Sequence, residues 1–326
     1  MRFLPRKALL ILISVSISAT ALAEKPGEAR QWLERMTTAM SQMSYQGSFV
    51  YVRGAVVETM RITHVADETG VRERLYSTSG PHREVIRDQK GVRCFLADSA
   101  SVVEDQVVAS SYFPEFPLSL FEDESNGYRL KMGGQARIAG HLARRVSVTP
   151  EDKFRYGYDF WLEKDSGLLL KWVLFDDRHK PLAKLMFTNF ATGSEIELEE
   201  LESDSKTEKF VEMQTMSLEK TVVSQSNPRW QPAHLPPGFR LTSHSHKTGE
   251  DGVYEHMVYS DGLAAVSVYV EQQKSGQEVK TGVSQLGTNN AYTRKQGDLQ
   301  ITVIGEVPAI TVKSIANQMA ISVASN

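Results

Sequence analysis

The segment DFWLEKDSGLLLKWVLFDD, which runs from Asp159 to Asp177, carries the clearest structural signal in the sequence. Two apolar runs flank the turn-forming residues 165–167, a pattern that predicts two antiparallel β-strands joined by a tight turn. The residues expected to share one face of the second strand are Leu168, Leu170, Trp172 and Leu174. Because Val173 and Phe175 point to the opposite face, this strand requires apolar cover on both sides.

Period-two alternation also runs through most of the chain before this hairpin. From Tyr45 onward, short alternating runs recur about every ten residues, separated by Gly, Asp and Ser. Strands this closely spaced predict an antiparallel meander rather than strand–helix–strand units. A sheet of this length has to curl toward a barrel or be covered, because exposed strand edges promote aggregation.

An amphipathic helix precedes the predicted strands. Its apolar stripe repeats at the helical period and consists of Trp32, Leu33, Met36, Ala39, Met40 and Met43. We expect this helix to cover one face of the sheet. The other face would then enclose either a packed core or a cavity for an apolar ligand, and the residues leave both alternatives open.

One segment, Ser110–Tyr128, interrupts the strand rhythm. It contains two prolines, Pro114 and Pro117. Its aromatic residues are Tyr112, Phe113, Phe116, Phe121 and Tyr128. A long apolar loop beside a barrel mouth is either a lid or a segment that plugs its own core.

The composition changes near residues 200–228, where acidic and polar residues replace the alternating pattern. We therefore predict a large N-terminal domain over residues 24–200, a linker over 201–228 and a small α+β domain over 229–326. In the small domain, Val253–Ser260 and Leu263–Glu271 are expected to pair across the turn residues 261–262. A closing helix after Pro308 is expected to place Val312, Ile315, Ala316, Met319 and Val323 on one face.

The N-terminus has the features of a cleaved signal peptide over residues 1–23. Arg2, Arg6 and Lys7 precede an uncharged apolar run, and a small-x-small site follows at residues 21–23. The run is short for a membrane span of about 20 residues, so cleavage is expected rather than anchoring. The sequence thus predicts an exported protein.

Charge and cysteine content narrow the class of protein further. The 37 basic and 40 acidic residues give a net charge of −3, and loss of the three basic residues of the signal peptide makes it −6. A weakly acidic chain is a poor general binder of nucleic acid. The single cysteine, Cys94, cannot form an intramolecular disulfide.

No familiar catalytic or metal-binding motif is present in the sequence. His244 and His246 would point the same way on a strand, but no third ligand stands at a telling spacing. Ser260 and Asp261 lie near His256, yet nothing positions a base, and the Asp-Gly pair is typical of a turn. We therefore predict no catalytic residue, no metal and no cofactor, and a binding or regulatory protein rather than an enzyme.

Three motifs of the small domain carry a family resemblance. They are LPPGF at residues 235–239, VYSDGLAAVSVYVE at 258–271 and GEVPAITVKSIA at 305–316. With the early GSFVY and the hairpin quoted above, they make the chain resemble the RseB/MucB family of periplasmic regulators of the envelope-stress sigma factor, sigma-E or AlgU.

The resemblance implies a fold and a function that the patterns alone do not give. The large domain would be an unclosed antiparallel β-barrel with helices, similar to LolA and LolB. The protein would reside in the periplasm, bind the periplasmic part of an RseA/MucA-like anti-sigma factor and hinder its proteolysis. Lipopolysaccharide or the acyl chains of mislocalised lipoproteins would release it, and it would form a homo-oligomer. A periplasmic lipid or lipoprotein carrier is the alternative function.

The resemblance also suggests candidate site residues. The residues placed at the anti-sigma surface are Tyr259, Asp261, Leu263, Tyr269 and Glu306. The residues placed in an apolar ligand cavity are Phe49, Tyr51, Tyr158, Phe160, Trp172 and Phe187. Either set could instead serve only the fold, as small-domain framework or as core.

Overall fold

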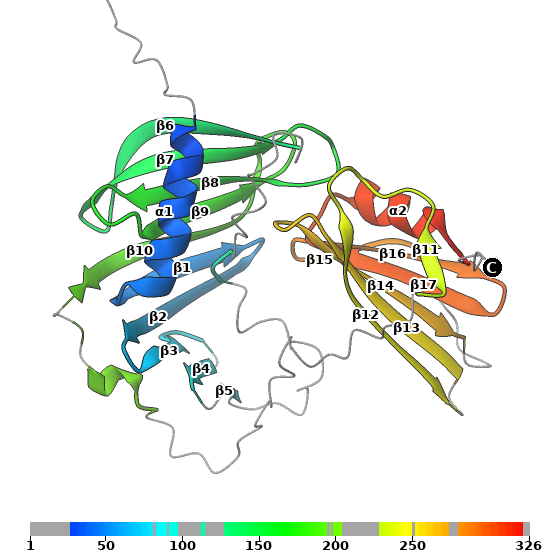
Figure 1. Cartoon of the computed structure of the whole chain (residues 1–326), viewed down its shortest axis with the longest axis horizontal. Helices are drawn as coiled ribbons and strands as arrows, with labels where there is room; N and C mark the ends of the chain where they lie inside the picture. The colour runs from blue at the N-terminus through cyan, green and yellow to red at the C-terminus, as the bar shows by residue number, and fades with distance from the viewer. Residues whose placement is uncertain are drawn as a thin grey trace, which may run out of the picture.

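The computed structural model describes residues 27–80, 83–89, 91–96, 112–114, 127–193, 196, 198–203, 228–249, 252–273 and 280–321. The predicted signal peptide, residues 1–23, and most of the predicted linker, residues 201–228, lie outside these residues. Two large antiparallel sheets, each with a helix packed on it, form the frameworks of a large and a small domain (Figure 1).

The large domain is built on one open sheet of ten strands in the order β5-β4-β3-β2-β1-β10-β9-β8-β7-β6. The strands before the Tyr112 segment are β1 (Tyr45–Arg53), β2 (Val56–Asp67), β3 (Gly70–Ser77), β4 (Arg83–Asp88) and β5 (Gly91–Leu96). Those after it are β6 (Tyr128–Ile138), β7 (His141–Pro150), β8 (Gly157–Glu163), β9 (Leu169–Phe175) and β10 (Pro181–Thr192). A single-turn helix, η4 (Leu198–Leu201), follows them. All neighbouring strands are antiparallel, as the short spacing between them predicts.

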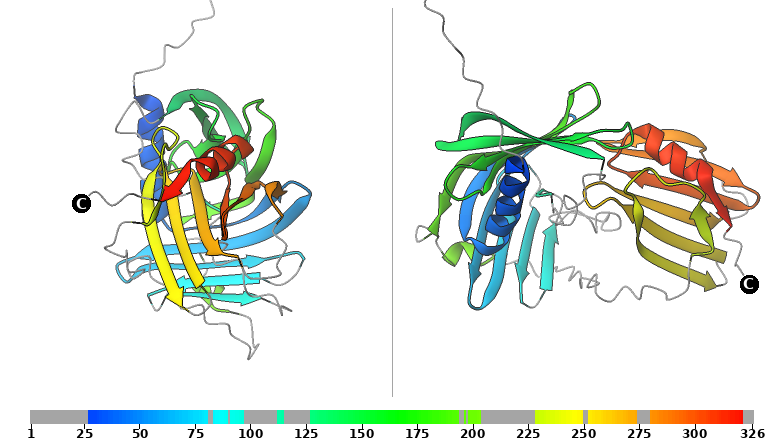
Figure 2. Two further views of the ribbon diagram at one scale, coloured as in Figure 1. Left: turned by 90° about the vertical axis from the view of Figure 1, so that its right-hand side faces the viewer. Right: turned by 45° about the horizontal axis from the view of Figure 1, so that its top comes forward.

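The helix α1 (Glu28–Gln42) packs inside the curl of this sheet (Figure 2). Its buried residues are Ala29, Leu33, Met36 and Ala39, which repeat at the helical period. They join one core cluster with the inward-facing residues of β1, whose burial alternates strictly from Tyr45 to Tyr51. The concave face of the sheet therefore holds the main core of the large domain.

The predicted hairpin forms, with Gly167 in the left-handed backbone region at φ +85°. Across β8 and β9, however, the register shifts so that Leu170 lies opposite no residue of β8. Leu170 packs with Ile138 and Ala143 in a separate cluster, whereas Trp172 belongs to the main core. The prediction that Leu170 shares a face with Trp172 is wrong, because the extra residue of a β-bulge reverses the alternation.

The small domain holds a six-stranded sheet in the order β12-β13-β14-β17-β16-β15. Its strands are β12 (Arg240–Gly249), β13 (Gly252–Ser260), β14 (Ala265–Gln272), β15 (Gly282–Leu286), β16 (Asn289–Gln296) and β17 (Leu299–Gly305). The helix α2 (Ala309–Gln318) packs on one face of it. A second, two-stranded sheet joins β11 (Trp230–Pro232) to β18 (Met319–Ile321).

The expected fold class is confirmed: the protein is mainly β, with an unclosed antiparallel sheet and a small α+β domain. The closing helix is shorter than predicted, because it ends at Gln318 and Met319 starts β18. Backbone pairing of Met319 with Pro232 takes the place of another helical turn. The predicted continuation to Val323 lies outside the described residues.

Within the part of the chain that the structure describes, no helix is both long enough and apolar enough to cross a membrane.

Candidate functional site

The turn between β13 and β14 organises itself through its own polar side chains. Asp261 Oδ1 accepts hydrogen bonds from the backbone N–H groups of Leu263 (2.8 Å) and Ala264 (2.7 Å). Ser260 Oγ donates to the Ala264 carbonyl at 2.9 Å and accepts from the Gly262 N–H at 2.9 Å. The positive φ of the turn, +99°, falls on Gly262 rather than on Asp261. The side chains of Ser260 and Asp261 therefore shape this turn.

The same turn carries a buried ion pair to the large domain. Asp261 Oδ2 lies 2.6 Å from Arg155 Nη1, and both side chains are fully buried. The Tyr128 hydroxyl donates to Asp261 Oδ2 at 3.0 Å. Burial, together with this carboxylate, raises the pKa of Tyr128 well above its usual value, so the hydroxyl remains a donor.

Arg155 is held on all sides, as a buried guanidinium requires. It contacts Asp152 at 3.0 Å, and its Nη2 donates to the carbonyl of Pro237, which belongs to the LPPGF motif. Its guanidinium carbon lies 5.0 Å from the ring centre of Tyr128 and 5.3 Å from that of Phe239. One arginine thus ties the large domain to two separate segments of the small domain.

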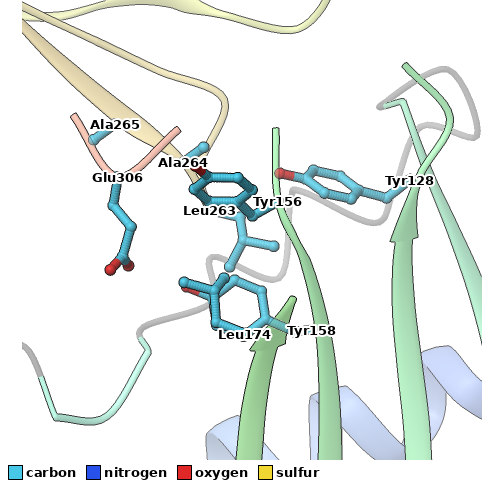
Figure 3. A pocket seen from close by; sticks show the side chains of 8 residues that line it. All are labelled: Tyr128, Tyr156, Tyr158, Leu174, Leu263, Ala264, Ala265 and Glu306. Carbon is cyan, nitrogen blue, oxygen red and sulfur yellow. The ribbon is translucent and has the colours of Figure 1, made fainter. Parts of the chain in front are cut away.

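A small pocket of about 30 Å³ lies where the domains meet (Figure 3). The large domain lines it with Tyr128, Tyr156, Tyr158 and Leu174, and the small domain with Leu263, Ala264, Ala265 and Glu306. Leu263 reaches between the large-domain side chains and packs against the main core cluster of that domain. An apolar side chain of one domain therefore completes the core of the other.

Two further hydrogen bonds cross between the domains. Asn290 Nδ2 donates to the Tyr156 hydroxyl at 3.0 Å, and Thr311 Oγ1 donates to the Phe154 carbonyl at 2.7 Å. We call the small-domain residues in this contact the joint. They are Asp261, Leu263, Asn290, Glu306 and Thr311.

Glu306 is the acidic residue of the joint pocket. Burial raises the pKa of its carboxyl group, while a hydrogen bond from Thr288 and the positive charge of Arg53 act in the opposite direction. Because the net change is upward, desolvation outweighs both stabilising contacts. The charged form of Glu306 is therefore less favourable in the folded protein than in water.

Glu306→Gln is expected to raise the thermal unfolding midpoint at neutral pH. The amide retains the oxygen that accepts the Thr288 hydrogen bond but carries no charge to desolvate. A raised carboxyl pKa destabilises the fold progressively as pH rises from about 4.5, the ordinary value, to the raised value, so the gain should be larger at pH 8 than at pH 4. Calorimetry across this range tests the sign, and a gain that does not change with pH would contradict the assignment.

The structure distributes the five candidate anti-sigma residues over three places. Asp261, Leu263 and Glu306 belong to the joint. Tyr259 is 2% exposed and packs in the core of the small domain. Tyr269 lies on the sheet face opposite α2, half-buried, with its ring stacked on His256 at 4.4 Å. Their contact with an anti-sigma factor stays a prediction.

The six candidate cavity residues lie together on the concave face of the large sheet. Five are buried and Tyr158 is half-buried. Tyr112 and Phe113 pack onto them: the Tyr112 ring lies 5.1 Å from Tyr51, and the Phe113 ring 5.5 Å from Phe49. Of the two alternatives for the Ser110–Tyr128 segment, the structure places its described aromatic residues, Tyr112 and Phe113, in the core.

Sequence reasoning missed Asn290 and Thr311 of the joint, as well as Arg155 and Tyr128, the large-domain residues that contact it. A fully buried arginine is unusual, but its neighbours in FRYGY gave only a hint that apolar groups surround it. Nothing local marks Asn290 as a contact of Tyr156. Among the described residues, no group of three or more His, Cys, Asp and Glu side chains could hold a metal ion.

Comparison with known proteins gives consistent matches along the chain. Residues 28–205 match the MucB/RseB N-terminal domain and residues 224–320 the MucB/RseB C-terminal domain. The sigma factor AlgU regulatory protein MucB of Pseudomonas aeruginosa is 32% identical over 321 residues, which cover 95% of this chain and 96% of that protein. The sigma-E factor regulatory protein RseB of Haemophilus influenzae is 24% identical over 329 residues, 98% of this chain and 99% of that protein.

A solved structure also matches most of the chain. The Pseudomonas aeruginosa MucA/MucB complex superposes with a TM-score of 0.71 at 30% identity, covering 91% of this chain and 100% of the matched chain.

Proposed function

The chain belongs to the MucB/RseB family, and from this premise we propose that it binds the periplasmic part of a membrane-spanning anti-sigma factor. By shielding that segment from regulated proteolysis, it would act as a negative regulator of an envelope-stress sigma factor. We propose further that it works in the periplasm as a binding protein without enzymatic activity. One observation carries the proposal: the MucA/MucB complex matches over 91% of this chain, both domains included.

Lipid ligands and self-association belong to the same proposal. Lipopolysaccharide or lipoprotein acyl chains would release the anti-sigma factor, and the protein would assemble as a homo-oligomer. The aromatic concave face of the large sheet, with Phe49, Phe160 and Phe187 buried on it, supports an acyl ligand. The joint supports a two-domain switch, because a ligand held by one domain could alter how the other docks.

Binding and protection are tested together. The mature chain and the purified periplasmic segment of an anti-sigma factor should form a complex in a pull-down, and proteolysis of the segment should slow in that complex. Two folded proteins that do not associate would overturn the proposal. Transfer of acylated cargo to an acceptor membrane would instead favour a lipid or lipoprotein carrier.

Among the five candidate surface residues, Tyr269 is the one best placed to touch a partner directly. It stands opposite α2, and Tyr254 lies 6.2 Å away on the same face. Tyrosine is enriched among residues that dominate binding energy, because it buries a large ring at little entropic cost.

Tyr269→Ala is expected to weaken binding of the anti-sigma segment by about tenfold, with circular dichroism unchanged. Tyr76→Ala is the matched control, since Tyr76 is a half-buried tyrosine of the large-domain strand β3. Isothermal titration calorimetry measures both variants. Equal losses in the two, or none in Tyr269→Ala, would remove Tyr269 from the partner surface.

A further inference from the structure

Tyr112 and Phe113 belong to no helix or strand, yet they pack on the aromatic concave face of the large domain. The Trp172 indole Nε1 donates to the Tyr112 carbonyl at 2.8 Å, in a buried position. Tyr112 is only 3% exposed. We call the pair Tyr112 and Phe113 the plug.

The plug is held chiefly by side chains. The Tyr112 hydroxyl donates to Glu58 at 2.9 Å and accepts from Arg83 at 3.0 Å. These contacts tie the ring to one residue of β2 and one of β4. The plug is no part of the ten-stranded ladder, so its removal would leave the pairing of those strands intact.

The plug covers much of the surface that an apolar ligand would use. Four of the six candidate cavity residues lie against it: Phe49, Tyr51, Trp172 and Phe187. The Phe113 ring lies 5.5 Å from Phe49 and 6.2 Å from Phe187. A flexible apolar chain could make the same contacts, and the two occupants would exclude each other because protein cores are densely packed.

Aromatic contacts continue from the plug to the joint. Trp172, which bonds the plug, lies 6.1 Å from Tyr158 between ring centres. Tyr158 in turn lines the joint pocket beside Leu263 (Figure 3). Tyr158 therefore connects Trp172 to the small domain through direct packing, so a change in what contacts Trp172 can reach the joint.

We propose that Tyr112 and Phe113 are a built-in occupant of an acyl-chain site, that an acyl chain displaces them, and that this displacement loosens the joint through Trp172 and Tyr158. This inference rests on the lipid ligand of the proposed function. It adds that the ligand binds at the concave face and that the plug competes with it there. Because of this competition, the apparent affinity for the acyl chain is the intrinsic affinity multiplied by the fraction of molecules in which the plug has left the concave face. Coupling to the joint is reciprocal, so a loosened joint must favour the ligand by the same factor.

The first test measures binding of dansyl-undecanoic acid to the full mature chain by fluorescence. Phe113→Ala is expected to bind the probe about tenfold tighter than the unmodified chain, and Tyr112→Phe a few-fold tighter because it loses only the hydroxyl contacts. Phe175→Ala is the matched control, since Phe175 is a buried phenylalanine of the same sheet that packs on His179 outside the main core cluster, and its affinity should not change. Weaker or unchanged binding by Phe113→Ala would overturn the plug.

Tyr112→Phe retains the ring and the backbone, so it keeps the test decisive even where Phe113→Ala folds poorly. Competition of the probe with lipopolysaccharide or with a triacylated lipopeptide distinguishes the two sources of an acyl chain. If the unmodified chain and the plug variants bind the probe equally, the proposed role of the plug is wrong, whereas the lipid ligand is supported. If neither the unmodified chain nor any variant binds the probe, lipopolysaccharide or lipopeptide, both the plug and the lipid ligand are overturned. Binding of the anti-sigma segment is tested by the separate pull-down.

The second test concerns the joint. Asp261→Asn, which weakens the Arg155 pair, is expected to bind the probe a few-fold tighter, as reciprocity requires. Conversely, saturating probe should increase the radius of gyration of the unmodified chain in small-angle X-ray scattering. A probe affinity unaffected by Asp261→Asn would overturn the coupling.

Discussion

Asp261→Asn is expected to undock the two domains without unfolding either of them. The asparagine keeps an oxygen for the turn but presents an amide N–H₂ group as well. Either the Arg155 guanidinium, which shares its oxygen with the Tyr128 hydroxyl, or the N–H groups of Leu263 and Ala264 must then face another donor. Breaking a fully buried ion pair costs about 3–5 kcal/mol, because the remaining charge is left uncompensated.

Undocking limits that cost. Once the domains separate, Arg155 is solvated again. The destabilisation caused by the substitution therefore cannot exceed the free energy of docking between the two domains. We therefore expect calorimetry to resolve two transitions in the variant and small-angle scattering to show a larger radius of gyration. A single unchanged transition with an unchanged radius would show that the Arg155–Asp261 pair does not hold the joint.

Glu151→Gln is the matched control for this experiment, since it makes the same change from carboxylate to amide in an exposed pair. Its partner Arg129 lies 2.9 Å away, with side chains 71% and 44% exposed. Exposed pairs contribute about 0–1 kcal/mol, so both measurements should match those of the unmodified chain.

Phe49→Ala is expected to lower the free energy of unfolding by about 3–5 kcal/mol. Phe49 is 0% exposed, and its ring lies 5.5 Å from Phe187, 5.5 Å from Phe113 and 5.8 Å from Tyr112. Deleting it leaves a cavity at the centre of these rings, and the surrounding strands can close it only in part. Urea unfolding followed by tryptophan fluorescence measures the change.

The same measurement separates a packed core from a ligand cavity. Were the concave face hollow, the Phe49 ring would make few contacts and its loss would cost less than about 1 kcal/mol. Val57→Ala is the control, because Val57 lies near the start of β2 and is 63% exposed. Its free energy of unfolding should stay within about 0.5 kcal/mol of that of the unmodified chain. A small loss for Phe49→Ala would favour an empty, ligand-sized space.

Much of the fold could be predicted because its determinants are local. The stripe from Leu33 to Ala39 repeats at the period of a helix, and β1 alternates at the period of a strand. The hairpin over residues 159–177 was equally predictable, because its turn residues stand between two apolar runs. The failures lie where long-range pairing overrides local pattern, at the Leu170 bulge and at Met319, which leaves the helix to pair with Pro232.

The candidate site was less predictable than the fold. Asp261 and Leu263 were singled out, but the residues they meet could not be. Arg155 and Asp261 are 106 residues apart, and no periodicity links charges at such a separation. Tyr112 and Phe113 were recognised as an apolar interruption, while their place against Phe49 follows only from the curl of the sheet.

The sequence by itself determined most of the secondary structure, the division into a curled sheet and a small α+β domain, and the family resemblance of the small-domain motifs. Those properties depend on backbone geometry and side-chain type within a few residues of one another. Only the tertiary structure decided that the Asp261 turn closes a joint with Arg155 and that Tyr112 occupies the concave face. Burying a charge or an aromatic ring requires partners on other elements, and folding alone brings those partners together.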